Sequence, residues 1–416
     1  MSELSYLEKL LDGAEVEWKT LGDVSTLKRG RVMSKDYLVE NAGSFPVYSS
    51  QTARNGIIGQ IDTFDFDGEY ISWTTDGANA GTVFYRTDKF SITNVCGLIK
   101  INDKSKLNCK FLFYLLSIKA KKHVYAGMGN PKLMSHQVEK VPVPIPCPNN
   151  PKKSLAIQGE IVRILDVFAS LTAELTAELN MRKKQYNYYR DRMLTFKDGE
   201  VEWLPLGGVI ESLKTGLNPR KNFTLSTSDA KGYYVTVREI QNGEIVFLDK
   251  TDRVNGEALK LINNRSNLEA GDILFSGTGT VGRISVIKEN PKNWNIKEGV
   301  YVIKPSHGII NSKYIAHLLN SQKIIQEYSR KIVGSPVISL PMSELKKLQI
   351  PIPCPNNPEK SLAEQSRIVS ILDKFDALTN SISEGLPREI SLRQKQYEYY
   401  RDQLLSFPKS LDIFQK

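Results

Sequence analysis

One long segment of this chain occurs twice, and this repetition constrains the fold more than any other feature. Residues 144–168 read PIPCPNNPKKSLAIQGEIVRILDVF, and residues 351–375 read PIPCPNNPEKSLAEQSRIVSILDKF. A second pair of copies follows, RKKQYNYYRDRMLTF from Arg182 and RQKQYEYYRDQLLSF from Arg393. The segments that precede the copies differ strongly. Near-identical connectors joined to divergent segments predict two units with a shared framework and separate specificities.

Length and charge bound the class of protein. A chain of 416 residues exceeds one ordinary domain, so two or more cores are expected. Hydrophobic residues make up 40% and charged residues 25%, as in a folded soluble protein. The net charge of +10 favours an acidic partner, of which nucleic acid is the commonest, although moderate basicity also serves solubility alone.

The cysteines and the N-terminal sequence indicate the compartment. The four cysteines form no CxxC pair, so neither a disulfide framework nor a zinc site is expected. The start, MSELSYLEKLLDG, lacks the layout of a signal peptide. No apolar run approaches the roughly 18 residues of a membrane span. We therefore expect a cytoplasmic protein without a membrane segment.

The repeats divide the chain into six segments. They are a helical run-in at 1–14, a first variable domain at 15–150, a first helical connector at 151–200, a second variable domain at 201–350, a second helical connector at 351–408 and a tail at 409–416. The variable domains mix strand-like stretches such as TVFYR and DILFSG with helix-like stretches such as FLFYLLSIKAKK. The expected fold class is α+β, with two mixed α/β domains separated by two long helices.

The connectors carry a helical pattern of apolar residues. These residues fall at steps of three and four from Ile157 to Leu179, and again from Ile368 to Ile382. The spacing predicts long helices with a narrow, coiled-coil-like stripe. We expect an antiparallel pair related by an internal pseudo-twofold axis, with one variable domain at each end. The alternative, in which each helix only covers its own domain, stays open.

The ends of the helices follow from local signals. The first helix is expected over residues 154–196, with Ser154 as its N-cap and Ser361 in the same role for the second helix. The second copy has four extra residues in a stretch that contains Gly385 and Pro387. Since proline and glycine disfavour a helix interior, we predict a kink or a break there.

Candidates for reading DNA bases follow from chemistry. Arg matches guanine, Asn or Gln matches adenine, and Ser or Thr matches either. Polar loops of this composition occur in both variable domains. The candidates are Ser49, Ser50, Gln51, Arg54, Asn55, Thr74, Thr75 and Asn79 in the first domain, and Arg238, Gln241, Asn242, Thr278, Thr280 and Arg283 in the second. The same residue types are ordinary turn formers, so a purely structural role for any one of them stays open.

Two further groups suit contacts outside the bases. Basic residues near the opening of each variable domain suit DNA phosphates. They are Lys28, Arg29, Arg31, Lys214, Arg220 and Lys221. The connector tails combine aromatic and basic residues, namely Tyr186, Tyr189, Arg190, Tyr397, Tyr400 and Arg401. Because the tails match between copies while the domains differ, we favour helix packing or partner docking over base contact for them.

Signatures of catalysis are missing from the sequence. The stretch GTGTVG from Gly277 matches a dinucleotide loop, but RISVIKE follows it and reads as a strand where a helix is required. We predict a glycine-rich hairpin, with GANAG from Gly77 as its counterpart. No GxxxxGK(S/T) loop and no (N/D)PP(Y/F) signature occurs, and the histidines lack metal-ligand spacing. We expect no catalytic residues and no metal site.

The PIPxP segments, the amphipathic connectors and the QYxYYRD tails closely resemble the specificity subunit of type I restriction–modification systems, over essentially the whole chain. The resemblance implies two target-recognition domains, at 15–150 and 201–350, each reading half of a gapped site in double-stranded DNA. It implies helices that set the gap and dock two methyltransferase subunits, which restriction and translocase subunits join. S-adenosylmethionine, ATP and Mg would sit on those partners, and this chain would have neither cofactor nor catalysis.

Two other functions stay open at this point. A fused restriction enzyme with its own methyltransferase is disfavoured by the missing motifs, and an activity assay on the isolated chain tests it. A scaffold that binds only proteins would show no salt-dependent binding to DNA. The bases that are read do not follow from composition, because readout depends on where the loops lie and on how the DNA deforms.

Overall fold

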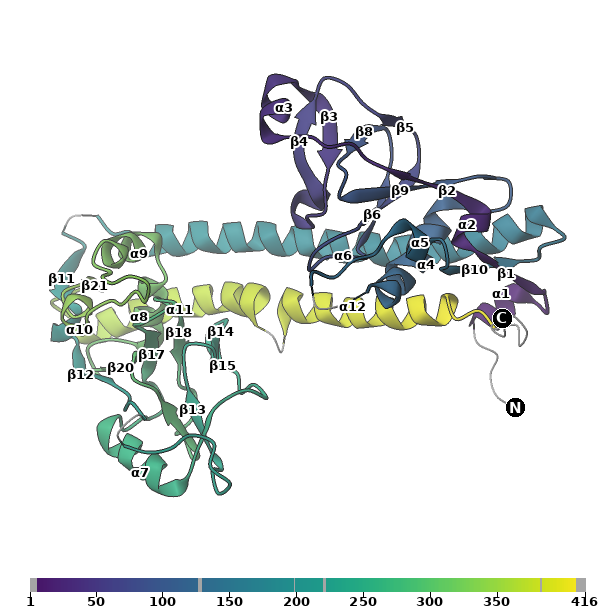
Figure 1. The fold of residues 1–416 in the computed structure, drawn as a ribbon. Helices are drawn as coiled ribbons and strands as arrows, with labels where there is room; N and C mark the ends of the chain where they lie inside the picture. The colour runs from purple at the N-terminus through teal and green to yellow at the C-terminus, as the bar shows by residue number, and fades with distance from the viewer. Residues whose placement is uncertain (1–5, 126–128, 198, 220–221, 382–383, 409–416) are drawn as a thin grey trace. The chain divides into compact units, whose positions relative to one another are not determined.

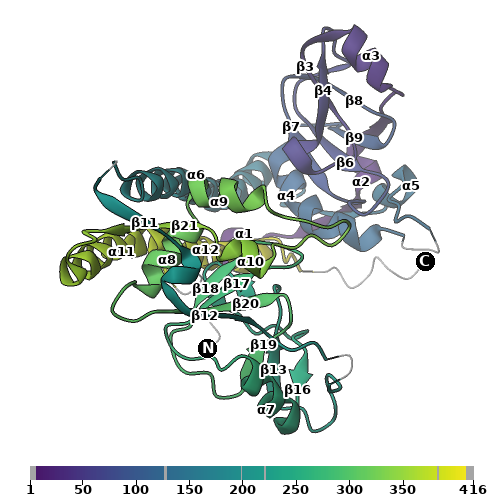
Figure 2. The same cartoon turned by 90° about the vertical axis from the view of Figure 1, so that its left-hand side faces the viewer.

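The chain forms two compact units in the computed structural model, which describes residues 6–125, 129–197, 199–219, 222–381 and 384–408. Unit 1 comprises residues 1–172 and 393–416, and unit 2 comprises residues 173–392 (Figures 1 and 2). The division falls inside the first connector, and the end of the second connector belongs with the first variable domain. The units therefore do not follow the order of the sequence segments.

The variable part of unit 1 is built on sheets with the strand orders β2-β9-β6-β7, β4-β3-β8-β5 and β1-β10. Its strands are β1 (Val16–Thr20), β2 (Ser25–Arg29), β3 (Ala42–Tyr48), β4 (Ile57–Ile61), β5 (Phe66–Asp67), β6 (Tyr70–Thr74), β7 (Val83–Arg86), β8 (Lys89–Ile92), β9 (Cys96–Ile101) and β10 (Pro142–Pro146). Its helices are α1 (Tyr6–Leu11), α2 (Leu21–Val24), α3 (Lys35–Glu40), η1 (Ala53–Gly56), α4 (Cys109–Lys119), η2 (Ala120–His123) and α5 (Ser135–Val138). In both views α3 lies beside β3 and β4.

The variable part of unit 2 has the strand orders β12-β20-β17-β18, β16-β13-β19, β14-β15 and β11-β21. Its strands are β11 (Val201–Pro205), β12 (Ile210–Thr215), β13 (Gly232–Val235), β14 (Ile240–Gln241), β15 (Glu244–Ile245), β16 (Arg253–Val254), β17 (Ile273–Ser276), β18 (Ile284–Val286), β19 (Trp294–Ile296), β20 (Val300–Pro305) and β21 (Gln349–Pro353). Its helices are η3 (Leu206–Gly208), α7 (Gly256–Arg265), α8 (Ser312–Leu319), α9 (Gln322–Ser329) and α10 (Met342–Leu345).

The two variable parts share one topology although their sequences diverge. The order β2-β9-β6-β7 corresponds to β12-β20-β17-β18, and β4-β3-β8 corresponds to β16-β13-β19, including one parallel pair in each. A glycine follows the equivalent strands β2 and β12. A Cβ on Gly30 would lie 2.1 Å from the carbonyl oxygen of Ile92, and one on Gly216 would lie 1.9 Å from that of Ile296. Such close backbone contact requires glycine at both positions. The helices and sheets of both variable parts confirm the α+β character expected from the sequence.

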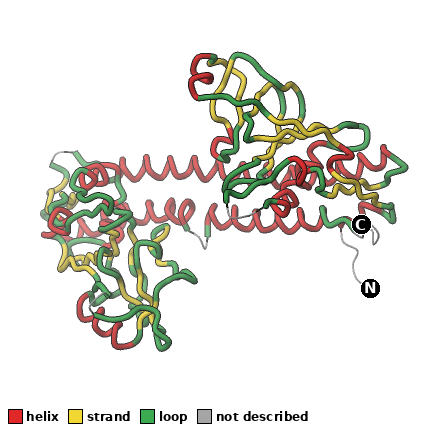
Figure 3. The backbone as a smooth tube through the Cα atoms, in the orientation of Figure 1, coloured by secondary structure: helices red, strands yellow, loops and turns green. Residues whose placement is uncertain are grey.

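The connectors are helical. The first is a single helix of 43 residues, α6 (Pro151–Met193), which Figure 3 shows without interruption. The second consists of α11 (Pro358–Asn380) and α12 (Gly385–Leu404), so the predicted break is present. Pro387 lies in the first turn of α12, where its missing N–H removes no intrahelical hydrogen bond.

The predicted N-caps, Ser154 and Ser361, are wrong. Each helix begins one turn earlier, at the proline that follows a repeated asparagine. The side-chain oxygens of Asn150 and Asn357 accept from the backbone N–H three residues later, at 3.0 Å in both units. Proline is well tolerated as the first helical residue, because its missing N–H would have no partner there.

A buried glutamine anchors each connector to the variable part of its own unit. The Oε1 atom of Gln158 accepts from the backbone N–H of Asn108 at 2.8 Å, and its Nε2 donates to the carbonyl of residue 106 at 2.9 Å. Gln365 bonds in the same way to the N–H of Asn311 at 2.8 Å and to the carbonyl of residue 309 at 3.1 Å. The repeated glutamine thus sets the same helix position against two divergent domains.

The end of the second connector completes the core of unit 1. Leu404, Leu405 and Phe407 are buried there, and the ring of Phe407 meets that of Phe111 edge to face at 5.9 Å. In unit 2 the end of the first connector does the same, with Leu194 in the core. Each unit therefore combines the start of one connector with the end of the other.

Candidate nucleic-acid interface

The first predicted loop of unit 1 joins β3 to β4. Arg54 and Asn55 are exposed at its tip, in left-handed backbone conformations with φ of 50° and 55°. Ser49 and Ser50 are partly buried, and the side chain of Gln51 donates to the carbonyl at the start of β4 at 2.5 Å. Gln51 therefore holds the loop, and the tip residues are the ones best placed to meet a base.

The second predicted loop of unit 1 is the turn of the β6–β7 hairpin. Asn79 is exposed in this turn, but Thr74 and Thr75 are fully buried. The hydroxyl of Thr74 donates to the carbonyl of Asn79, and that of Thr75 donates to the carbonyl of Val95 at 2.9 Å. A buried hydroxyl with a partner presents nothing to a base. In this conformation the two threonines shape the turn, and their predicted reading role stays a prediction.

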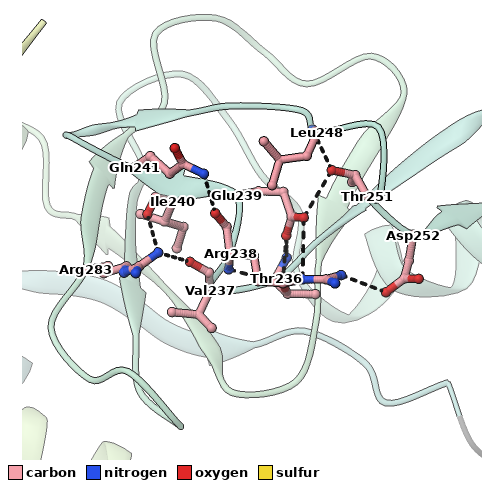
Figure 4. A network of polar contacts seen from close by, with 10 residues as sticks. All are labelled: Thr236, Val237, Arg238, Glu239, Ile240, Gln241, Leu248, Thr251, Asp252 and Arg283. Carbon is pink, nitrogen blue, oxygen red and sulfur yellow. Dashed lines mark hydrogen bonds and ion pairs between the residues drawn. The ribbon is translucent and has the colours of Figure 1, made fainter. Parts of the chain in front are cut away.

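In unit 2 the predicted segment around Arg238 lies in the connection from β13 to β16 (Figure 4). Glu239 is fully buried and anchors this segment. Its carboxylate accepts from the N–H of Thr236 at 2.8 Å, from the hydroxyl of Thr236 at 2.7 Å and from the hydroxyl of Thr251 at 3.1 Å. These bonds offset the cost of burying a carboxylate. The side chain of Arg238 is exposed, and its guanidinium reaches Asp252 at 3.1 Å.

The next two candidates have local structural roles. Asn242 and Gly243 form the two-residue turn of the β14–β15 hairpin, with φ of 48° and 81°. Asn-Gly is the preferred pair for this turn type, so the turn by itself explains Asn242. Gln241 donates from Nε2 to the carbonyl of Arg238 at 2.9 Å, which holds it against its own loop.

The GTGTVG stretch forms the turn between β17 and β18, so the predicted hairpin is confirmed. Thr280 is exposed in this turn, and the hydroxyl of Thr278 lies 3.1 Å from that of Ser339. Arg283 is exposed at the end of the turn. Its Nη1 donates to the carbonyls of Val237 and Ile240, at 3.0 and 3.3 Å. The hairpin therefore contacts the segment that carries Arg238.

The two sets of candidates occupy equivalent places in the shared topology. Residues 49–56, here named candidate loop 1, follow β3, and residues 236–252, here named candidate loop 2, follow the equivalent strand β13. The glycine-rich hairpins β6–β7 and β17–β18 are equivalent as well. No sequence pattern marks the equivalence of the loops, because they differ in length and composition.

Two of the predicted phosphate contacts are also equivalent. Lys28 on β2 and Lys214 on β12 are exposed and face matching residues of β9 and β20 in the strand register. Arg29 is exposed beside Lys28. The guanidinium of Arg31 bonds to the hydroxyl of Tyr37, the largest cause of its raised pKa, and to a neighbouring carboxylate. The remaining two predicted residues lie outside the described residues: Arg220 and Lys221.

The tail residues divide into buried and exposed members. Tyr186 and Arg190 are buried in unit 2, with the guanidinium carbon 5.4 Å from the centre of the ring. Tyr397 and Arg401 repeat this contact in unit 1 at 5.7 Å. Burial raises the pKa of both phenols, so they stay neutral at physiological pH. These contacts support the predicted packing role for these four residues.

Tyr189 and Tyr400 are exposed by 37% each, and both stack on a phenylalanine of a connector helix. Tyr189 stacks on Phe375 at 5.6 Å, and Tyr400 stacks on Phe168 at 5.3 Å. The preceding tyrosines are more exposed still: Tyr188 in unit 2 by 59% and Tyr399 in unit 1 by 61%. The resulting aromatic patches are Phe168, Tyr399 and Tyr400 in unit 1 and Phe375, Tyr188 and Tyr189 in unit 2.

Two negative findings hold for the part of the chain that the structure describes. No group of three or more His, Cys, Asp or Glu residues in it could hold a metal ion. No helix among the same residues is long and apolar enough to cross a membrane.

Comparisons with known proteins agree with the repeated architecture. The family described as "Type I restriction modification DNA specificity domain" matches residues 14–182 and 199–392. The EcoR124I/EcoR124II specificity subunit of Escherichia coli is 38% identical over 98% of both chains. A putative type I specificity subunit of Haemophilus influenzae is 33% identical over 97% of this chain and 98% of its own. The solved S subunit of M. genitalium has a TM-score of 0.58 at 17% identity, covering 96% of this chain and 98% of that one, and is similar in fold.

Proposed function

This chain belongs to the type I restriction–modification DNA specificity family, and from that premise we propose that each of its two units reads one half of a split DNA target. The role of the family is DNA sequence specificity. The bipartite reading is our inference, and it assigns candidate loop 1 and its hairpin to one half-site and candidate loop 2 and its hairpin to the other.

One observation carries the proposal: the two variable parts have the same strand order, but their candidate loops expose different side chains. Candidate loop 1 presents Arg54 and Asn55, whereas candidate loop 2 presents Arg238 on a turn fixed from inside by Glu239. Arginine favours guanine and asparagine favours adenine in the major groove. Two readers with one framework and different side chains are expected to read two different half-sites, so the full target is asymmetric.

The equivalent lysines support a common placement of the two units on duplex DNA. Lys28 and Lys214 are exposed at the same register position, and phosphate contacts of this kind position a reader without conveying sequence. The net charge of +10 is in keeping with such a partner.

We further propose that the connector helices determine the unread spacer between the half-sites. Helix α6 is unbroken, and its first part belongs to unit 1 while its second part belongs to unit 2. A rigid helix shared between two readers would set the distance between the base pairs that they meet, as dimer geometry sets half-site spacing in other DNA-binding proteins. The antiparallel pairing of the connectors remains a prediction.

The two aromatic patches are proposed as docking sites for two copies of one partner, the methyltransferase subunit. The patches match in geometry and in exposure although the variable parts differ. Exposed tyrosines are typical of protein–protein interfaces, where they contribute large contact areas. Restriction and translocase subunits would then join this complex, and catalysis would take place on the partners.

A genome-wide map of adenine methylation in host cells, with and without this chain, tests the proposal. The expected result is the loss of one gapped, two-part motif. Replacing residues 201–350 with another variable domain should change one half of that motif only, and a change in both halves would contradict separate readers. Inserting a few helical residues between Leu171 and Met181 should change the length of the spacer with both half-sites kept. A lack of salt-dependent binding to DNA would favour a scaffold that binds proteins only.

A further inference from the structure

Each unit sends one arginine from its glycine-rich hairpin to its own candidate loop. In unit 2 this residue is Arg283, which immediately precedes β18, and in unit 1 it is Arg86, the last residue of β7. The two arginines stand at different points of equivalent hairpins. Sequence alignment of the two variable parts would therefore not pair them. The two arginines are alike because each contacts the candidate loop of its own unit.

The side chain of Arg283 binds the backbone of candidate loop 2. Its Nη1 donates to the carbonyls of Val237 and Ile240, which lie on either side of Arg238 and Glu239 in the sequence (Figure 4). The buried carboxylate of Glu239 holds the same turn from within. The turn is thus fixed from two directions, and Arg238 is the side chain that it presents outward.

Arg86 contacts both ends of candidate loop 1. Its guanidinium carbon lies 3.6 Å from the ring centre of Tyr48, the residue before the loop, and 4.4 Å from that of Phe84. Its Nε donates to the hydroxyl of Ser72 at 2.9 Å. A Cβ on Gly56, the last residue of the loop, would lie 3.1 Å from its Nη2. The guanidinium therefore lies beneath the start and the end of the loop at once.

The burial of Arg86 is unusual for a cation. The residue is only 2% exposed, and burial lowers the pKa of its guanidinium to about 10, so it is still charged at neutral pH. Within the described residues it has no ion pair, and its Nη1 has no hydrogen-bond partner. A buried charge without a carboxylate is costly, and simple packing would be served better by an apolar side chain. Its contacts with Tyr48 and Gly56 at the two ends of the loop point to a role in the conformation of the loop.

We propose that Arg86 and Arg283 are positioning residues for sequence reading: each holds the candidate loop of its own unit in the conformation that meets the bases, without touching DNA itself. The inference rests on the proposed function, because it assumes that each loop reads one half-site. It assigns Arg283 a role different from the base contact that its residue type favours.

The test uses the full chain produced together with the methyltransferase subunits of its own system. Genomic methylation is mapped for the wild type, Arg86→Met and Arg283→Met. Each variant is expected to methylate sites with one wrong base pair in one half about tenfold more often relative to the correct site, and to read the other half as before. The half that relaxes in Arg86→Met should stay intact in Arg283→Met, and the reverse.

Lysine variants separate charge from shape. A lysine at position 283 can still donate to the two carbonyls, so Arg283→Lys should restore most of the discrimination. A lysine at position 86 lacks the planar group that lies on the Tyr48 ring, so Arg86→Lys should not. If a methionine variant does not co-purify with its partner, the lysine variant and Tyr48→Leu decide by the same half-site criterion.

The outcomes are distinct. A wild-type map without any gapped motif would refute the proposed function itself. A wild-type motif whose two halves relax equally in both methionine variants, or in neither, would refute the positioning role and leave the proposed function intact. Relaxation confined to one half, and to opposite halves in the two variants, would establish the inference.

Discussion

Replacing Phe407 by alanine should destabilise unit 1, although Phe407 follows the second variable domain in the sequence. The side chain is 5% exposed and packs edge to face on Phe111 at 5.9 Å. Removing a buried phenylalanine side chain costs about 3–5 kcal/mol, and we take the lower value of about 3 kcal/mol. For a unit of this size, that loss lowers the melting temperature by roughly 6–12 °C.

Hydrogen exchange measured by mass spectrometry shows which unit is affected. A loss of about 3 kcal/mol speeds exchange through unfolding by roughly a hundredfold, since every 1.4 kcal/mol is a factor of ten. Peptides from α4 should show this change in Phe407→Ala, while peptides from α8 should not. The repeat mate, Phe196, is partly buried against the core of unit 2, so Phe196→Ala should show the reverse pattern with a smaller increase. A larger increase of exchange in α8 than in α4 for Phe407→Ala would refute the assignment of Phe407 to the core of unit 1.

Three further changes test the structure. Gln158→Leu should cost about 2 kcal/mol, because it leaves a backbone N–H and a carbonyl without their partner, and urea unfolding measures the loss. Gly216→Ala should cost about 1–3 kcal/mol in a thermal melt, because its Cβ would meet a carbonyl oxygen at 1.9 Å. Burial acts to raise the pKa of Asp373, but hydrogen bonds from His317 and Lys313 outweigh it and lower the pKa. The ionised Asp373 therefore stabilises the fold above its ordinary pKa of 3.8, and this stabilisation is lost as the pH falls through the lowered pKa. Asp373→Asn should lower the free energy of unfolding at pH 7 and have no effect on it in strong acid.

Several features were predictable because their cause is local. The apolar spacing of the connectors specifies helices, and the break before Gly385 follows from the conformational preferences of glycine and proline. The β-branched stretch after GTGTVG specifies a strand, which excludes a dinucleotide site. The caps failed for a related reason: Asn150 and Ser154 are both good caps, and only the start of the helix at Pro151 decides between them.

The composition of the candidate loops was predictable, but the burial of their side chains was not. Arg54 and Arg238 are exposed on loops, as their residue type and neighbours suggest. Thr74 has the same polar character, but its hydroxyl is buried within a turn. Burial depends on residues distant in sequence, so composition does not distinguish a reading side chain from a shaping one. For the same reason, nothing in the sequence around Arg86 marks it as a contact of a loop 30 residues earlier.

By itself, the sequence determined the two repeated units and their helical connectors, because repeats and periodicity are readable from residue order. It also contains neither a GxxxxGK(S/T) loop nor an (N/D)PP(Y/F) signature. Only the tertiary structure decided that the two variable parts have one fold. In unit 1 the indole N–H of Trp73 donates to the carbonyl of Leu133 at 3.0 Å, and in unit 2 the hydroxyl of Tyr301 donates to the equivalent carbonyl of Leu340 at 2.7 Å. Different side chains on different strands satisfy the same backbone group, so the contact persists while the sequence similarity is lost.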